Sequence, residues 1–398
     1  MALRQFGRGC GGKLKDFYRL FLLPASILAG TSIGAGIFSL PFVFNKTGIS
    51  AGFVYLAVFC AVFIVVHLMY ADIILRTEGR HRFVGYARIY LGAAASWLAT
   101  AMTVLSMVVV LVIYLVLSVS FVNVIVPDAR GDFYKMAVFW LFGSSAIFLS
   151  VRRLALAEFL VLGGIIAAIV IIFVFGILKA GDFGKINWLF FDSAYFLLPF
   201  GPILFSLSGR PAIPDVVDYY ENIGGNRRKL IKKSLIWGTI APAVVYAVFV
   251  LGVLLLSGAV SEDAISGIAG ALPRWALLVI GALGVISLWS SYIVIGMDVK
   301  DILSYDFRAP KIVSALLVVI APMALFMAGF QSFLALVGVA GGVFLALEGI
   351  FIVAMWKRAA ALSPAPSAFF GKMPPAALYF LAAIFTLGMI YEIIKSGM

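Results

Sequence analysis

The chain has 398 residues, of which 64% are hydrophobic and 12% are charged, and its formal net charge is +12. Soluble domains carry about 25% charged residues, so this composition excludes a soluble protein and predicts an all-α integral membrane protein. The two cysteines cannot build a disulfide framework, and with two histidines they offer no zinc-site spacing. No phosphate-binding loop of the G-x-x-x-x-G-K type is present, and the loops are too short for a nucleotide-binding domain, so we expect neither an ATP-driven pump nor an enzyme.

A helix that crosses the bilayer needs about 20 mostly apolar residues. Eleven segments satisfy this requirement, and we number them as spans one to eleven in chain order. Their approximate bounds are 20–44, 51–75, 92–126, 134–151, 154–178, 189–213, 235–257, 274–300, 311–329, 332–356 and 375–395.

The basic residues predict how these spans are oriented. With the N-terminus inside, 22 of the 30 Lys and Arg residues fall in inside segments and seven fall outside, while Arg210 lies within span six. This asymmetry satisfies the positive-inside rule. It predicts a cytoplasmic N-terminus in a plasma or inner membrane, with the positive charge facing anionic lipid rather than nucleic acid.

Span one is interrupted at membrane depth. Residues 28–41 read Leu-Ala-Gly-Thr-Ser-Ile-Gly-Ala-Gly-Ile-Phe-Ser-Leu-Pro, with three glycines and a proline. Glycine and proline weaken a helix, and lipid offers no partner for freed backbone groups. A broken helix at the midplane is how many secondary transporters build a substrate site.

Span six carries a second interruption, with four prolines and two glycines in residues 198–214. Five spans separate the starts of the two broken segments, and because five is odd, equivalent spans cross in opposite directions. This predicts a 5+5 inverted repeat with discontinuous helices 1 and 6. The expected parts are a basic cytoplasmic tail at 1–19, repeats at 20–178 and 179–356, and a loop with an eleventh helix at 357–398. The alternative is a pair of kinked helices with tight glycine packing.

These motifs resemble a known family. Residues 34–41 (Gly-Ala-Gly-Ile-Phe-Ser-Leu-Pro) are similar to the first-helix signature of the amino acid/auxin permease family of the APC superfamily. Residues 198–214 resemble its sixth helix, and Ser290-Ser291-Tyr292 with the following aspartates resembles the end of its eighth. The stretch 226–230 is closest to the bacterial hydroxy/aromatic amino acid permeases. The resemblance implies the LeuT fold and ion-coupled amino acid uptake, although this chain has Arg210 where relatives commonly carry a histidine.

A broken helix supplies both charges that an amino acid zwitterion needs. The free N–H groups at residues 33–36 are expected to face the carboxylate, and the carbonyls at 29–31 and 205–207 to face the ammonium. Hydroxyl groups can add contacts, and Phe38, Phe205 and Tyr114 are candidates for the side-chain pocket, with ordinary packing as the alternative. The predicted substrate-binding residues are Ala29, Gly30, Thr31, Ser32, Ile33, Gly34, Ala35, Gly36, Phe205, Ser206, Leu207 and Ser208.

The coupling ion is either H⁺ or Na⁺. The fold implied by the resemblance places a sodium ion between Ser290, Ser291 and carbonyls of helix one, where hard cations find oxygen ligands. The alternative is serine packing in a membrane helix. His67 and Glu348 are candidate proton carriers, with a polar interhelix contact as the alternative. No other metal and no cofactor is expected.

Arg210 follows the second break directly. It is expected to pair with Asp215, Asp218 or Glu348 as an inner gate, to replace a coupling ion as a fixed cation, or to extend to the cytoplasmic surface. Three further acids, Asp72, Glu158 and Asp298, fall near predicted cytoplasmic ends and are expected to be interfacial.

The sequence thus predicts a secondary active symporter for a neutral amino acid, and the resemblance implies an aromatic one. By the resemblance, spans 1, 2, 6 and 7 rock against spans 3, 4, 8 and 9 during alternating access. The alternative function is a passive channel or substrate sensor on the same fold. The expected partners are the amino acid and the lipid bilayer, and the sequence leaves the oligomeric state open.

Overall fold

The computed structural model describes residues 16–127, 131–148, 155–180, 186, 188, 190–224, 227–305, 309–362, 367–370 and 373–397, without the side chains of 155–161, 180 and 305. Every regular element among these residues is helical. Most of the predicted basic tail and the side chain of Glu158 lie outside the described residues.

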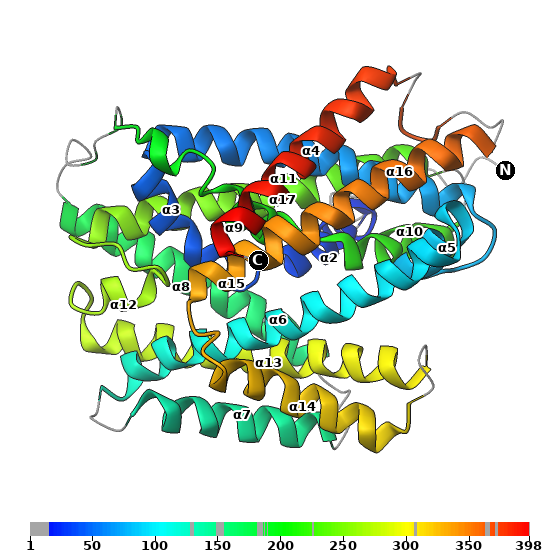
Figure 1. Ribbon diagram of the computed structural model, residues 1–398. Helices are drawn as coiled ribbons and strands as arrows, with labels where there is room; N and C mark the ends of the chain where they lie inside the picture. Colours follow the sequence, from blue (N-terminus) through cyan, green and yellow to red (C-terminus); the bar gives the residue numbers. More distant parts are fainter. Residues whose placement is uncertain are drawn as a thin grey trace, which may run out of the picture.

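Spans one to five form the first part of the bundle (Figure 1). Span one begins as a π-helical turn at Tyr18–Leu22, slightly before the predicted position, and continues as α2 (Leu23–Ser32), the 3-10 turn η2 (Ala35–Ser39) and α3 (Leu40–Thr47). Spans two to five are α4 (Ile49–Arg76), α6 (Ala93–Ile125), α7 (Asp132–Phe148) and α8 (Ala155–Ala180). A short helix that the hydropathy pattern did not predict, α5 (Phe83–Leu91), connects α4 to α6.

Spans six to eleven follow. Span six consists of α9 (Phe200–Leu207), the 3-10 turn η5 (Arg210–Ala212) and α10 (Ile213–Ile223), and a 3-10 turn, η4 (Ser193–Tyr195), precedes it. Spans seven to nine are α11 (Arg228–Leu256), α13 (Arg274–Tyr305) and α14 (Lys311–Met327), with α12 (Ile265–Ile268) before α13. Span ten is α15 (Phe333–Val339), the π-helical turn η6 (Ala340–Leu345) and α16 (Ala346–Leu362), and span eleven is α17 (Pro375–Ser396).

The predicted bounds of span six, 189–213, are wrong by about ten residues. The helix begins at Phe200 and ends at Ile223, so its second half includes Asp215, Asp218 and Glu221. Hydropathy missed this half because one face of α10 is charged.

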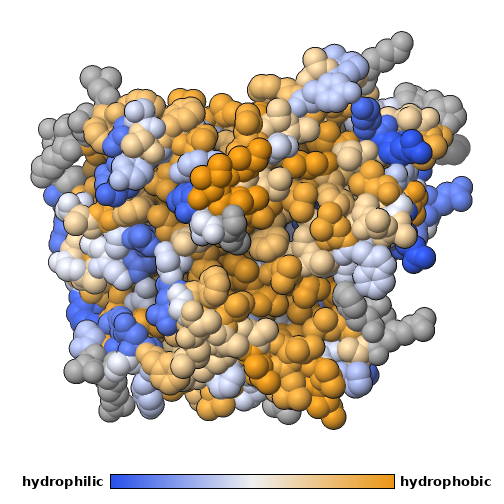
Figure 2. Space-filling model, in the orientation of Figure 1, coloured by the Kyte–Doolittle hydropathy of each residue, from blue (hydrophilic) through white to orange (hydrophobic). Residues whose placement is uncertain are grey.

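Within the described residues, seven helices are individually long and apolar enough to cross a membrane, and there are eight if the bent pair Tyr18–Ser32 and Ala35–Thr47 is taken as one span. The remaining predicted spans correspond to the shorter α7 and α14 and to the interrupted α9–α10, which is consistent with the expected eleven. In Figure 2, hydrophobic residues form a band across the visible face, and hydrophilic residues gather towards the two ends of the helices. Exposed apolar side chains such as Trp97, Leu178 and Phe380 are those that lipid would cover.

The two broken spans meet in the interior of the bundle. The helix α2 packs against α11 and α10, and η2 packs against α9. On the other side of α9 lie α15 and η6, which α17 also contacts. The two interruptions are therefore held between spans seven and ten.

Candidate functional site

The break in span one is a short stretch of extended backbone. The helix α2 ends at Ser32, Ile33 has ψ 98°, and Gly34 has φ −142° and ψ −156°. The helical direction changes by 54° across the break. The first N–H groups of η2, at Ala35 and Gly36, have no acceptor within their own turn, because a helix start leaves its leading donors free.

The break in span six has the same form. The helix α9 ends at Leu207, Ser208 is extended with ψ 118°, and Gly209 precedes η5. Pro211 and Pro214 then start the second half, where the missing proline N–H costs nothing because no intrahelical acceptor is available.

Glycines allow the two breaks to touch each other. A Cβ atom on Gly36 would lie 2.6 Å from Ser206 Oγ and 2.9 Å from Ser206 Cα. A Cβ atom on Gly209 would lie 2.5 Å from both Ser32 Oγ and Leu28 Cδ1. A side chain at Gly36 would therefore press on backbone, whereas one at Gly209 would require the ends of the Leu28 and Ser32 side chains to move.

Tyr246 of α11 joins the carbonyl ends of both first halves. Its hydroxyl lies 2.6 Å from Ser32 O and 2.6 Å from Ser206 O, and the side chain is fully buried. A phenol has one proton, so it cannot fully satisfy two carbonyls. The negative ends of two half-helix dipoles thus converge on one point, which is an environment suited to a positive group.

The predicted hydroxyls are bonded within their own helices. Thr31, Ser32 and Ser206 donate to the carbonyls of Ile27, Leu28 and Pro202 at 2.9, 3.1 and 2.7 Å. The carbonyl of Ala29, which we expected to face an ammonium, accepts from Ile33 N at 3.1 Å. The carbonyl that faces across the gap belongs to Ser32, at the last residue of α2.

Gly34 differs from the other glycines at the breaks. A Cβ atom at Gly34 would meet no atom within 4 Å, whereas one at Gly30 would lie 3.2 Å from Leu162. Among the predicted substrate-binding residues, Gly34 therefore borders open space next to the free N–H groups of η2.

Aromatic rings surround the second half of span one. The ring of Phe38 lies 5.2 Å from that of Phe121 and 5.6 Å from that of Phe249, both edge to face. Phe205 packs against the hydrophobic core at the end of α9. Tyr114 of α6 is buried and interacts with the hydroxyl of Ser291. Ser291 turns towards α6, and Ser290 is buried. Neither observation tests the sodium site at this pair, which stays a prediction.

Arg210 pairs with Glu348 of α16. Its Nε lies 2.7 Å from Glu348 Oε2, and the two side chains are only 14% and 10% exposed. The guanidinium also lies over the ring of Phe83 at 4.5 Å and interacts with the Tyr70 hydroxyl. Of the three expected acidic partners, the structure shows Glu348.

Asp218 instead pairs with Arg80, at 2.9 Å, on the exposed surface. Arg210 does not extend to the surface, so that interpretation is wrong. Its pairing joins span six to spans two and ten and to α5.

His67 is buried against span seven. Its Nδ1 lies 2.9 Å from Thr239 Oγ1, and the Thr239 hydroxyl donates to Leu235 O at 2.8 Å. Since threonine has one proton, the imidazole is the donor in this pair. Its Nε2 is buried without a hydrogen-bond partner in the part of the chain that the structure describes.

Asp72 lies one turn before the end of α4 and is fully buried inside the protein. It pairs with Arg76 at 3.0 Å and accepts hydrogen bonds from Trp356 Nε1, Ser367 Oγ and Ala368 N, each at 2.8 Å. This carboxylate ties α4 to α16 and to the segment before α17. A buried carboxylate with four partners is a structural junction that sequence position alone did not indicate.

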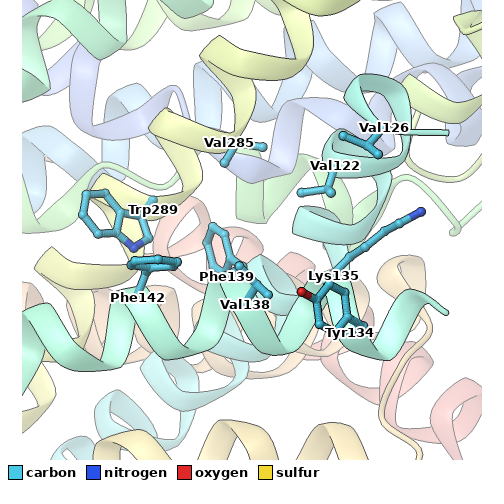
Figure 3. Close-up of a pocket in the computed structure, with 9 residues that line it drawn as sticks. All are labelled: Val122, Val126, Tyr134, Lys135, Val138, Phe139, Phe142, Val285 and Trp289. Atoms are coloured by element: carbon cyan, nitrogen blue, oxygen red, sulfur yellow. The ribbon is translucent and has the colours of Figure 1, made fainter. Parts of the chain in front are cut away.

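Two of the cavities in the described part of the chain are of particular interest, and both lie away from the breaks. One, of about 460 Å³, is mostly apolar and lies between α6, α7 and α13, with Phe139, Phe142 and Trp289 along its wall (Figure 3). The other, of about 520 Å³, is more polar and is lined by Asn45 and Lys46 of α3 together with Asp192 and residues that follow α11. By the predicted orientation it faces outside, opposite to the Arg210–Glu348 pair.

The comparisons with known proteins agree with this geometry. The chain matches the tryptophan/tyrosine permease family over residues 19–394. No curated protein matches it.

Several solved transporters share the fold. MhsT in complex with L-phenylalanine has a TM-score of 0.59 and 15% identity, covering 94% of this chain and 98% of its own. Mhp1 in an inward-facing conformation has a TM-score of 0.64 and 12% identity, covering 94% and 89%. A manganese transporter of Eremococcus coleocola has a TM-score of 0.66 and 12% identity, covering 98% and 89%.

These matches confirm the predicted fold class and the resemblance to aromatic amino acid permeases. The chain is a secondary transporter of the LeuT fold, not an enzyme, and it belongs to the tryptophan/tyrosine permease family.

Proposed function

We propose that this protein is a symporter that carries an aromatic amino acid together with a cation, H⁺ or Na⁺, into the cell. The observation that carries the proposal is the convergence of the Ser32 and Ser206 carbonyls on Tyr246. An α-ammonium group placed at this point receives two carbonyl dipoles, and the carboxylate then lies near the free N–H groups of η2. The family match and the rings around Phe38 support an aromatic side chain.

The ionic pair supplies the inner gate of this proposal. Arg210 of η5, the turn that leads into α10, is held to Glu348 of α16 on the side where the basic loops are expected to lie. Inward release requires α10 to move relative to the breaks, so the pair must separate during each cycle. The polar cavity beside Lys46 is then the approach from outside, with the N-terminus in the cytoplasm of a plasma or inner membrane.

Counterflow in proteoliposomes tests the proposal. Liposomes loaded with unlabelled tryptophan should accumulate labelled tryptophan, tyrosine or phenylalanine above the outside concentration, and lysine should not compete. A channel gives equilibration without accumulation, and a sensor gives binding without flux. Either result contradicts the proposal and favours the alternative function.

The position of the substrate is tested at Gly34. A Gly34→Ala change adds a methyl group to open space, so we expect unchanged stability and a KM for tryptophan raised about tenfold, which equals about 1.4 kcal/mol. Gly270→Ala is the matched control, because its Cβ also meets no atom within 4 Å but lies in the loop before α13. An unchanged KM in Gly34→Ala would contradict the binding of the substrate at this break.

A further inference from the structure

One buried acid has no part in the site described above. Glu392 of α17 is 1% exposed, although it lies only one turn from the end of span eleven. Its Oε1 is 3.2 Å from Lys395 Nζ, and the Lys395 side chain is 31% exposed. Its Oε2 is buried and has no hydrogen-bond partner within the described ranges.

Glycines of span ten make the space for this carboxyl. A Cβ atom on Gly338 would collide with Glu392 Oε1, and one on Gly342 would lie 2.9 Å from Glu392 Cγ. These glycines flank and enter the π-helical turn η6 (Ala340–Leu345), an irregularity that is frequent at functional sites. The backbone of span ten therefore lies directly against the Glu392 side chain.

The same turn touches span six. A Cβ atom on Gly341 would lie 2.9 Å from Phe205 N and would overlap Gly201 O. One turn before Glu392, Gly388 lies directly under the ring of Phe200. The carboxyl thus reaches the broken helix through one layer of backbone, and α9 ends at the Ser206 carbonyl that bonds to Tyr246.

Few charged groups share this environment. Lys395 and Tyr391 face Glu392 from its own helix. The packed elements α9, α15 and η6 contain no titratable residue. On α16, Glu348 is engaged with Arg210, and Lys357 lies over the ring of Tyr379. The charges of Glu392 and Lys395 cancel when the carboxyl is ionised. Proton uptake at Glu392 therefore leaves the positive charge of Lys395 unbalanced.

We propose that Glu392 is the proton-binding carboxyl that couples transport to a proton gradient. This inference rests on the proposed symport function and names H⁺ as its ion. A proton from outside reaches the carboxylate beside the partly exposed Lys395 and converts it to a neutral carboxyl, and release to the inside restores the carboxylate. The unpartnered Oε2 is the oxygen that takes the proton, and the span-ten glycines place this carboxyl against the backbone that contacts α9.

The test compares Glu392→Gln with wild type in proteoliposomes. Wild type should accumulate labelled tryptophan under an inward proton gradient and acidify an internal pH dye. Glu392→Gln should keep tryptophan counterflow but lose gradient-driven accumulation at least tenfold, with no proton entry. Glu262→Gln, the same change at an exposed loop position, is the matched control and should behave as wild type.

Two further variants keep the result decisive if Glu392→Gln does not fold. Glu392→Asp should retain proton-driven uptake. Lys395→Met should move the pH dependence of uptake upward by about one unit, because removing a neighbouring cation raises the proton affinity of a carboxylate. Proton entry in Glu392→Gln, an unshifted profile in Lys395→Met, or uptake driven by sodium alone overturns the inference. Absence of tryptophan counterflow in wild type contradicts the proposed function instead.

Discussion

The two interrupted spans touch each other at a glycine in each, but the two glycines contact different kinds of atoms. In span one, the glycine at the contact faces backbone, since a Cβ on Gly36 would press on Ser206 Cα. In span six, the glycine at the contact faces movable side-chain ends, the Leu28 methyl and the Ser32 hydroxyl. The first break therefore has no room to adjust, while the second has neighbours that can shift.

The two breaks also differ in charge. The stretch from Ala29 to Ser39 has no ionisable residue, whereas Arg210 opens the second half of span six and is locked to Glu348. The first break is thus an uncharged stretch whose glycine contacts backbone, and the second is an interruption held to span ten by an ion pair. In the proposed transport cycle, the first would bind the substrate and the second would open.

The largest expected effect is at the Arg210–Glu348 ion pair. Glu348→Gln leaves Arg210 buried without its anion, which costs about 3–5 kcal/mol of stability when one partner of a buried pair is removed. The midpoint temperature of thermal unfolding in detergent should fall sharply, and so should the rate of tryptophan uptake. Because Glu221 contacts Arg80 at 4.0 Å on the surface, Glu221→Gln should change stability by less than about 1 kcal/mol.

The double variant Arg210→Gln/Glu348→Gln should recover part of the stability that the single change removes, since no charge is then left bare. Equal stability of Glu348→Gln and Glu221→Gln would show that the second break is not fastened by this pair.

An intermediate effect is expected at the crossing of the breaks. Gly36→Ala should lower stability by about 1–3 kcal/mol, because the added methyl group meets backbone in a filled interior. Gly209→Ala should cost less than about 1 kcal/mol, since Leu28 and Ser32 can change rotamer. Chemical or thermal unfolding of the two variants measures the difference, and the reverse order would refute the asymmetry drawn here.

A smaller effect than at Gly36 is expected at Tyr246, whose hydroxyl contacts a carbonyl at each break. Tyr246→Phe removes one donor from two carbonyls and should lower the stability of the substrate-free protein by about 1 kcal/mol. Saturating tryptophan should reduce the difference in stability between this variant and wild type, because the ammonium group of the substrate can donate hydrogen bonds to the two carbonyls. A gap that does not respond to substrate would separate Tyr246 from the substrate site.

Much of the fold was predictable because its signals are local. Apolar length marked most spans to within a few residues, and clustered glycine and proline marked both interruptions. The bounds of span six failed because α10 carries Asp215 and Asp218 on a helix that hydropathy reads as a loop. The buried position of Asp72 was missed for a related reason: its partners Trp356 and Ser367 are almost 300 residues away in the chain.

The sequence by itself determined that this chain crosses the membrane many times, with two broken spans at corresponding positions of two halves. Composition and backbone chemistry suffice for that, because lipid tolerates few other arrangements. Only the tertiary structure decided that Tyr246 joins the two breaks, that Glu348 is the partner of Arg210, and that glycines of span ten enclose Glu392. These contacts link helices distant in the chain, and several side chains of the right type compete for each until packing selects one.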